Sequence, residues 1–370
     1  MTPRPPRVLV LTASVGAGHD IPAQALARGL RARRADVQVE ILDALDTMGR
    51  LVHGAAEDAM RRTFGDGRLN WVFDLQYLLF ARSPLRRLGQ VALLRSGGPR
   101  LLDAVARRQP DVVVSTYPAA TEVLGRLRRS GRLATPAVSA ITDLASLHYW
   151  ASPGIDLHLV THPESLPEVE RIAGPTVARP ARGLHDERFL EPPEREQARR
   201  ALGLPPDGAV VAVSGGGWGV GDLESAVQTA LERRGTTVLA LCGRNEQLRE
   251  HLAAAFPKLA VRVLPFVDDM PTLLAASDVL VHSTAGLTVL EALLVGCRPI
   301  SYGWGVGHIR ANNQAYRRLG LARVAADRAA LRSALADALA EPRRPLAAEF
   351  AGFPHAADLV LGLVDGRRSR

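Results

Sequence analysis

Short aliphatic runs alternate with longer amphipathic segments along most of this 370-residue chain. Short apolar runs bounded by polar residues or glycine are typical of buried strands, and the periodic segments between them are typical of helices. Strands separated by helices predict parallel sheets built from right-handed crossovers. In the first half the expected strands are Val8–Thr12, Val37–Leu42, Val112–Ser115, Ala137–Ile141 and Leu157–Val160, and the expected helices cover Ala23–Arg33, much of 50–100, and Ala119–Arg129.

A second set of strands follows the proline- and charge-rich stretch Glu191–Asp207. Two such sets predict an α/β protein with two facing Rossmann-like domains. We expect a first domain at 1–182, a linker at 183–206, a second domain at 207–350, and a C-terminal helix at 351–370 that packs back on the first domain. The strands of the second set are expected at Ala209–Ser214, Val238–Cys242, Val261–Leu264, Val279–Val281 and Pro299–Tyr302.

Composition narrows the class of protein. Hydrophobic residues make up 47% of the chain and charged residues 23%, as in an ordinary soluble globular protein. Cys242 and Cys297 lie in apolar surroundings without metal-ligand spacing, which predicts buried thiols in a reducing compartment and no metal site. The apolar run Val8–Leu11 is too short for a signal peptide, and none approaches the ~20 residues of a membrane span. We therefore expect a cytoplasmic protein.

The first glycine-rich turn, Ser14–His19, directly follows the first expected strand. Gly16 and Gly18 let the backbone approach a ligand and turn sharply into a helix. A dinucleotide-binding GxGxxG motif would need a third glycine where Ile21 stands, which argues against NAD or FAD. The imidazole of His19 is suited to take a proton from an attacking hydroxyl. The alternative is that it caps the helix.

A second polar position follows the expected strand Ala137–Ile141, at the edge where parallel sheets bind ligands. Asp143 has three open interpretations there: it orients His19, acts as the base itself, or caps a helix. His148 and Trp150, on the loop just beyond, are candidates for lining an acceptor pocket, with packing between domains as the alternative.

A second glycine loop follows the first strand of the second set. Gly215, Gly216 and Gly217 would offer amide N–H groups and room for a diphosphate or sugar, and a flexible hinge is the alternative. No Gly-Lys-Ser/Thr follows, so this is not a P-loop. Further on, Phe266 is a candidate for stacking on a base and Val267 for a backbone hydrogen bond to it; core packing is the alternative for the phenyl ring.

The most informative run is VHSTAGLTVLE at 281–291. A strand ends there in the small residues Thr284, Ala285 and Gly286, and a helix is expected to start at the glycine. A helix N-terminus at the end of a parallel strand is a ready site for phosphate. Glu291 falls about one turn into that helix, within reach of sugar hydroxyls. Together these residues predict a nucleotide site.

The motifs GxGH near the N-terminus, GGG in mid-chain, and FVDDM, TAGLTVLEAL and NNQ further on resemble glycosyltransferase family 28 over nearly the whole chain. That family includes the monogalactosyldiacylglycerol synthases, the processive diacylglycerol glucosyltransferases and the N-acetylglucosaminyltransferase that completes lipid II. The segments 112–118 and 141–156 are most similar to the diacylglycerol branch, whereas 266–270 and 287–291 are more similar to the lipid II enzyme.

The resemblance implies a GT-B fold whose second domain binds a UDP-sugar and whose first domain binds a lipid acceptor, with diacylglycerol expected. It implies inversion at the anomeric carbon without a metal or other cofactor. His19 would be the base or its near partner, helped by Asp143, and Glu291 would bind the ribose hydroxyls. Phe266 and Val267 would flank the uracil. Gly215–Gly217 and Thr284–Gly286 would face the diphosphate.

The distribution of charge along the chain supports contact with a membrane surface, as a lipid acceptor would require. The net charge is +8, and residues 50–132 hold 15 arginines against seven acidic residues. The segment 71–80 is rich in aromatic and leucine residues and precedes Arg82, Arg86 and Arg87, a combination that suits an anionic bilayer surface. We expect peripheral contact with the inner face of the plasma membrane and no nucleic-acid partner; core helices with arginine caps are the alternative.

One segment departs from the family pattern. Relatives carry Pro-Gly-Gln-Glu or Asp-Gln ahead of the asparagine, and those side chains read the donor hexose. Here Ile309 cannot hydrogen-bond, which leaves His308 and Asn312 for that role. The donor hexose therefore stays open. Alternatives to the main hypothesis are a lipid-linked peptidoglycan precursor or a soluble natural product as acceptor, a UDP-sugar 2-epimerase, and an inactive nucleotide-sugar-binding protein.

Overall fold

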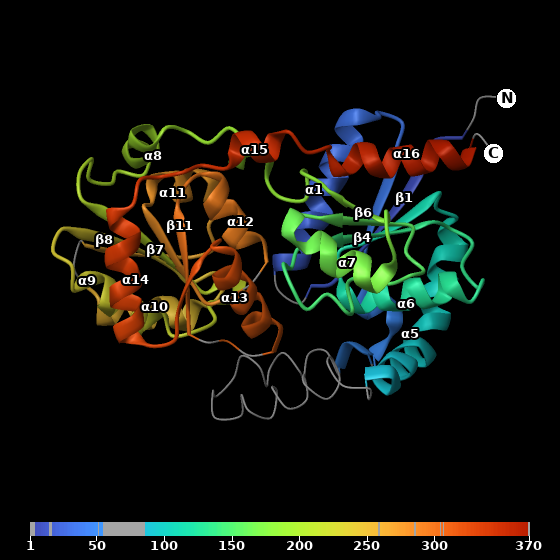
Figure 1. The fold of residues 1–370 in the computed structure, drawn as a ribbon, viewed down its shortest axis with the longest axis horizontal. Coiled ribbons are helices and arrows are strands. Elements are labelled where there is room, and N and C mark those ends of the chain that lie inside the picture. The colour runs from blue at the N-terminus through green and yellow to red at the C-terminus, as the bar shows by residue number, and fades with distance from the viewer. Residues whose placement is uncertain are drawn as a thin grey trace. The chain divides into compact units, whose positions relative to one another are not determined.

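The computed structural model describes residues 4–14, 17–50, 52–54, 86–257, 260–284, 286–303, 305 and 307–368. The chain divides into two compact units, each built on a six-stranded parallel sheet (Figure 1). Met1–His185 and Phe353–Arg370 form the first unit, and Asp186–Gly352 form the second.

The first sheet has the strand order β2-β1-β3-β4-β5-β6, and every pairing is parallel. The direction in which successive strands are added reverses between β1 and β3, so a crevice is expected beyond the carboxyl ends of these two strands. The strands are β1 (Arg7–Thr12), β2 (Gln38–Asp43), β3 (Val112–Ser115), β4 (Ala137–Ile141), β5 (Leu157–Val160) and β6 (Ala178–Pro180). The helices are α1 (Ala17–Arg33), α2 (Ala44–Met48), α5 (Arg86–Arg108), α6 (Pro118–Arg129), α7 (Leu166–Ala173) and α16 (Ala356–Arg368), with a 3-10 turn η3 at Pro163–Ser165.

Helices bury both faces of this sheet, which explains why its strands are apolar at successive positions. In β1, Val8 and Val10 point to the face covered by α1 and α16, whereas Leu9 and Leu11 point to the face covered by α2, α5 and α6. All four side chains are almost fully buried. Burying each contributes roughly 1.5–3 kcal/mol relative to leaving it in water.

The last helix of the chain belongs to the first unit. In Figure 1, α16 lies alongside α1, and the contacts agree. Ala356, Val360 and Val364, spaced four apart on one helix face, are fully buried in the core of this unit. His355, just before the helix, packs tightly on the chain at Gly183, where an added Cβ would lie 2.3 Å from the imidazole carbon Cε1.

The second sheet has the order β12-β11-β10-β7-β8-β9 and is also parallel throughout. Its order reverses between β7 and β10. The strands are β7 (Ala209–Ser214), β8 (Thr236–Leu241), β9 (Val261–Leu264), β10 (Val279–His282), β11 (Arg298–Tyr302) and β12 (Arg323–Ala325). The helices are α8 (Arg195–Ala201), α9 (Leu223–Leu231), α10 (Glu246–Ala255), α11 (Met270–Ala276), α12 (Leu287–Leu294), α13 (Gly307–Leu319), α14 (Arg328–Ala340) and α15 (Ala347–Ala351), with 3-10 turns η4 (Glu187–Phe189) and η5 (Gly216–Trp218).

Every expected strand is present, with ends that differ by a few residues at most. Two strands were missed, β6 and β12, because each is a three-residue strand at a sheet edge and has no long apolar run. The first helix was placed too late: α1 begins at Ala17 and contains Pro22, rather than starting at Ala23. Among the helices that the structure describes, none combines the length and apolarity needed to cross a bilayer.

Candidate functional site

The first candidate cluster lies where the order of the first sheet reverses, at the carboxyl ends of β1 and β3. His19 lies in the first turn of α1 rather than on the turn before it, so the expectation of a loop histidine was wrong. Its ring Nδ1 is 2.9 Å from the backbone oxygen of Thr116, and the Thr116 hydroxyl donates to the His19 backbone oxygen at 2.9 Å. Because a carbonyl oxygen can only accept, Nδ1 is the donor in the bond to Thr116.

Aromatic rings hold the His19 imidazole. The Tyr117 ring meets it edge to face with centroids 5.1 Å apart, and the Trp150 ring lies 5.8 Å away at a 46° tilt. The Trp150 indole Nε1 donates to Asp143 Oδ2 at 2.9 Å. Asp143 lies two residues beyond the end of β4 and is followed by bends and turns, so the interpretation of this residue as a helix cap was wrong. The cluster therefore joins two candidates, His19 and Asp143, through Trp150.

Two ionisable neighbours show how the site is charged. Burial, then the negative charge of Asp43, raises the pKa of Tyr117 to about 12, so its hydroxyl stays protonated. Burial also opposes ionisation of Asp43, but hydrogen bonds from the backbone N–H groups of Ser14, Asp46 and Leu45 outweigh it and hold that pKa below its usual value. Asp43 is therefore ionised at neutral pH, and its carboxylate accepts a bond from the Ser14 N–H just after β1.

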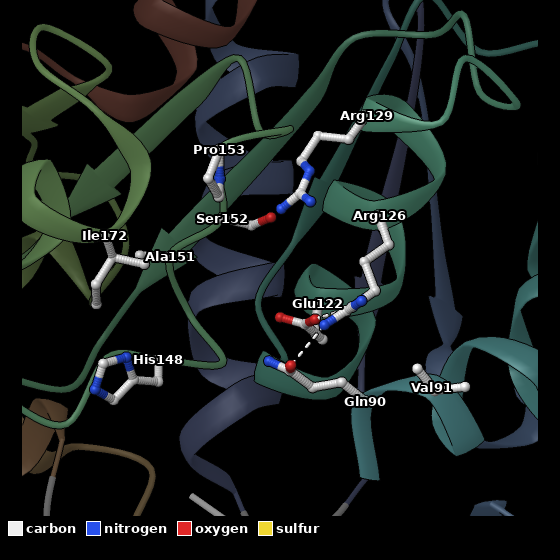
Figure 2. A pocket seen from close by; sticks show the side chains of 10 residues that line it. All are labelled: Gln90, Val91, Glu122, Arg126, Arg129, His148, Ala151, Ser152, Pro153 and Ile172. Carbon is white, nitrogen blue, oxygen red and sulfur yellow. Dashed lines mark hydrogen bonds and ion pairs between the residues drawn. The ribbon is translucent and has the colours of Figure 1, made fainter. Parts of the chain in front are cut away.

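A pocket of about 410 Å³ lies beside this cluster in the first unit (Figure 2). Arg126 is fixed in its wall by a bond to the buried Glu122 and by a 2.5 Å bond to Gln90. Figure 2 shows Arg129 and Ser152 pointing toward one another across the opening. The lining residues come from α5, α6, α7 and the β4–β5 loop: Gln90, Val91, Glu122, Arg126, Arg129, His148, Ala151, Ser152, Pro153 and Ile172.

The β4–β5 loop serves both features. His148 lines the pocket, as expected for an acceptor-side residue, whereas Trp150 is 3% exposed and turns into the His19 cluster. Gly18, at the start of α1, is exposed and has open space where a Cβ would project. The structure therefore places His148 and Trp150 on the β4–β5 loop and Gly18 at the start of α1.

In the second unit the glycine loop and the start of α12 come together at the reversal between β7 and β10. Gly216 has a φ of +69°, and a Cβ there would lie 3.0 Å from the Thr284 methyl group. The loop is closed by its own backbone, since Gly215 accepts a bond from Val220 and Gly217 accepts one from Arg244. The Gly216 N–H donates to the Ser214 hydroxyl at 3.1 Å, so this amide is already bonded and is not simply open to a ligand.

The helix that begins beside this loop has the polarity of an anion site. Gly286 is the N-cap of α12, adopts a φ of +88°, and gives the helix no side-chain cap. The first turn carries no acidic residue, so its N–H groups and the positive end of the dipole are not neutralised from within α12. Ala285 lies outside the described residues. The predicted phosphate site at this helix start stays a prediction.

Glu291 lies on α12 and is 7% exposed. Burial, and secondarily the negative charge of Asp186, raises its pKa from 4.5 to about 7. A buried carboxyl that titrates near neutrality is typical of a functional position more than of a structural ion pair. Nearby, His282 ends β10 and bonds Ser301 at 3.0 Å, and burial lowers its pKa to about 4, so it is neutral.

The base-pocket candidates lie after β9. The Arg244 guanidinium stands 4.3 Å from the centroid of the Phe266 ring, a cation–π contact that covers one face of it. Phe266 and Val267 are both half-buried rather than core residues. Sequence reasoning did not single out Arg244; its position just after β8, at the same sheet edge, was the available signal.

The hexose-reading candidates occupy the start of α13. His308 is half-buried, and its backbone oxygen accepts a 2.9 Å bond from the Asn312 side chain, which is fully buried. Ile309 is 5% exposed, and its side chain packs against Gly305. Its apolar character is therefore explained by packing. Within the described parts of the chain, no group of histidine, cysteine, aspartate and glutamate is arranged to hold a metal ion.

Comparisons with known proteins show which families this chain is similar to. Residues 19–174 match the family model of monogalactosyldiacylglycerol synthase, and residues 216–341 match that of glycosyl transferases group 1. This chain is a glycosyltransferase. The similarity to family 28 predicted from the motifs is confirmed.

Two curated relatives and one solved structure illustrate the similarity. Processive diacylglycerol beta-glucosyltransferase of Bacillus licheniformis is 22% identical over 80% of this chain and 76% of its own length. Monogalactosyldiacylglycerol synthase 1 of Arabidopsis thaliana is 25% identical over 84% of this chain, which spans 60% of the plant protein. The structure of spinosyn rhamnosyltransferase with spinosyn aglycone is 16% identical and covers 96% of this chain and 99% of that one, with a TM-score of 0.62. The expected GT-B fold is thereby confirmed.

Some candidates of this glycosyltransferase lie outside the described residues. They are Gly16, the aromatic segment 71–80 and Arg82 of the basic region; of Arg86 and Arg87 only the backbone is described. Sequence reasoning also missed Thr116 and Tyr117 as site residues. Both stand directly after β3, and their place at a carboxyl strand end could have found them.

Proposed function

We propose that this glycosyltransferase moves a hexose from a UDP-sugar to diacylglycerol at the cytoplasmic face of a membrane, with inversion and without a metal. The observation that carries the proposal is the division of chemistry between the two units. The first unit holds at its sheet reversal a histidine whose Nδ1 is bonded to a backbone oxygen, and the second holds at its own reversal a helix start without a side-chain cap and a buried carboxyl.

The second unit suits a nucleotide diphosphate. The α12 N-terminus lies beside the glycine loop, where backbone can approach phosphate oxygens closely. As the sugar–phosphate bond breaks, negative charge grows on the departing diphosphate, and a fixed helix dipole stabilises it without a cation. Glu291 would accept hydrogen bonds from the ribose hydroxyls, and Phe266 would offer the uracil its uncovered face.

The first unit has features suited to a catalytic base and to an acceptor-binding pocket. Nε2 of His19 would take the proton of the acceptor hydroxyl as that oxygen bonds to the anomeric carbon, while the electron pair of the broken bond leaves with UDP. The pocket beside the cluster has an apolar side formed by Val91, Ala151, Pro153 and Ile172. Leu88, 65% exposed on the same helix as Val91, extends this apolar surface to the outside.

The decisive experiment measures UDP release from UDP-glucose, UDP-galactose and UDP-N-acetylglucosamine, each with and without diacylglycerol in mixed micelles. We expect release with one sugar that depends on the lipid, and a glycolipid product detected by mass spectrometry. Release that is slow and indifferent to the lipid with every sugar would contradict diacylglycerol as acceptor. A soluble hydroxylated acceptor would then be tested in its place.

Two substitutions test the catalytic base and the lipid-binding pocket separately. His19→Gln should abolish transfer and leave UDP affinity unchanged, since it alters only the first unit. Val91→Glu places a charge at the apolar pocket wall on an exposed site and should raise the KM for lipid while the KM for UDP-sugar stays constant. Leu319→Glu is the matched control, because it adds the same charge at a 40% exposed leucine of the second unit and should change neither constant.

A further inference from the structure

The contacts around His19 assign a role to Trp150 that no motif indicated. Its indole stands between the two candidate catalytic side chains: one ring contact with His19 at 5.8 Å and one N–H bond to Asp143 at 2.9 Å. The hydrogen bond described for the Nδ1 atom of His19 goes to the Thr116 backbone instead of to a carboxylate. The group that holds Nδ1 of the base is thus a carbonyl, and the Asp143 carboxylate accepts a bond from the Trp150 indole.

We propose that Trp150 is a positioning residue that couples Asp143 to the base His19, so that the carboxylate works through the indole. The proposal rests on the proposed function, because it requires His19 to take a proton during transfer. A carboxylate that accepts the indole N–H pushes electron density into the ring. The richer ring then attracts the imidazolium that forms on His19, whose centroid lies within the roughly 6 Å reach of such cation–π contacts.

Trp150 is held rigidly enough for this role. It is 3% exposed and packs in an apolar cluster with Ile141, Leu147 and Val169. Its backbone oxygen accepts a 2.8 Å bond from the hydroxyl of Ser139, which lies on the buried strand β4. The indole cannot swing away from His19 without breaking this packing, so the distance is a property of the fold.

Other charged groups near His19 also influence its pKa, and the effect of Asp143 must be distinguished from theirs. Asp20, the next residue of α1, accepts a 2.8 Å bond from the Thr12 hydroxyl. Asp43 stands at the end of β2, and Tyr117 is neutral and lies on the ring edge. Among the described residues, Asp20 bonds Thr12, whereas Asp43 bonds the backbone of Ser14, Leu45 and Asp46. Asp20 therefore offers a matched control for a charge that acts directly through space.

The test reads the His19 pKa by NMR in the intact chain, with histidine labelled at Cε1 and the signal assigned by its loss in His19→Gln. Trp150→Phe and Asp143→Asn should each lower the His19 pKa by about half a pH unit, since each weakens the attraction for the imidazolium. In the Trp150→Phe background, Asp143→Asn should cause little further change, whereas Asp20→Asn should shift the pKa equally in both backgrounds.

Transfer kinetics give the second readout. Both variants should move the acid limb of the kcat/KM profile to lower pH and reduce kcat several-fold, with the KM for UDP-sugar constant. An Asp143→Asn shift of equal size with and without Trp150 would overturn the proposal, as would an unchanged His19 pKa in Trp150→Phe. If Trp150→Phe does not fold, Asp143→Asn still tests the coupling, because Asp143 is only half-buried. An unchanged His19 pKa in Asp143→Asn would refute the coupling. Because the NMR titration needs no activity, failure of the proposed function would be recognised separately.

Discussion

Replacing Glu291 by glutamine isolates the energetic consequence of burying this carboxyl. Its pKa is about 7 in the folded chain against 4.5 for an exposed glutamate, because burial and then Asp186 disfavour the charged form. The difference corresponds to about 3 kcal/mol. Below pH 4.5 the carboxyl is protonated in both the folded and unfolded chain and adds no pH dependence. From pH 4.5 to 7 the unfolded chain releases its proton first, so the wild type loses stability as pH rises.

Glu291→Gln has no proton to release and should escape this loss. We expect the variant to match the wild type near pH 4 and to exceed it by about 3 kcal/mol at pH 8. Urea denaturation of both proteins across this range gives the free energy of unfolding, and hydrogen exchange of 279–294 confirms that the change belongs to the second unit. Glu246→Gln is the control: it is exposed and its pKa is held low by Arg249, so its effect should have the opposite sign.

Binding of UDP supplies the functional half of the same prediction. If the ribose hydroxyls donate to ionised Glu291, UDP affinity should rise between pH 6 and 8, and binding near pH 7 should release a proton. Glu291→Gln should bind UDP about tenfold more weakly, because it loses a charge-assisted hydrogen bond, and should lose the pH dependence. Calorimetry in buffers of different ionisation enthalpy measures both. A stability difference that is flat from pH 5 to 8 would contradict the raised pKa of Glu291, and UDP affinity equal to that of the wild type would contradict its role in binding ribose.

Three further predictions concern the scaffold. Gly243→Ala should weaken UDP binding at least tenfold in calorimetry, because the φ of Gly243 is +60° and a Cβ would lie 2.5 Å from the Gly216 and Gly217 oxygens. The control is Gly235→Ala, at a φ of +75° with open space around the added Cβ, which should cause only a small loss of stability and leave UDP binding normal. Asp278→Asn should lower the free energy of unfolding by about 3–5 kcal/mol in urea titration, because it leaves the buried Arg199 without its 2.8 Å charged partner; an effect below 1 kcal/mol would contradict this account. Burial holds the pKa of His158 at about 4, so the wild type should lose stability as pH falls from 6.5 toward 4, and His158→Asn should reduce that slope in melting curves recorded between pH 7 and 4.5.

Local pattern was sufficient for much of the fold. Strands such as Val112–Ser115 and Ala209–Ser214 are buried on both sides, so their apolar character persists at every position and their bounds can be read directly. The edge strands β6 and β12 were missed because their few residues are exposed on one side and look like loops. The early start of α1 was missed because proline inside a helix contradicts local propensity, and tertiary packing overrides it here.

The amino-acid pattern was enough to predict two α/β units, a glycine turn after the first strand of each, a histidine near the first turn and a carboxyl-bearing helix in the second unit. These features are local, because strand, turn and helix signals act over a few residues. Which side chains come into contact is known from the tertiary structure alone. His19 touches Thr116 and Trp150, Asp143 bonds the indole, Arg244 covers Phe266, and Ile309 is a packing residue. Contacts between distant residues depend on strand order and helix packing, which no short segment encodes.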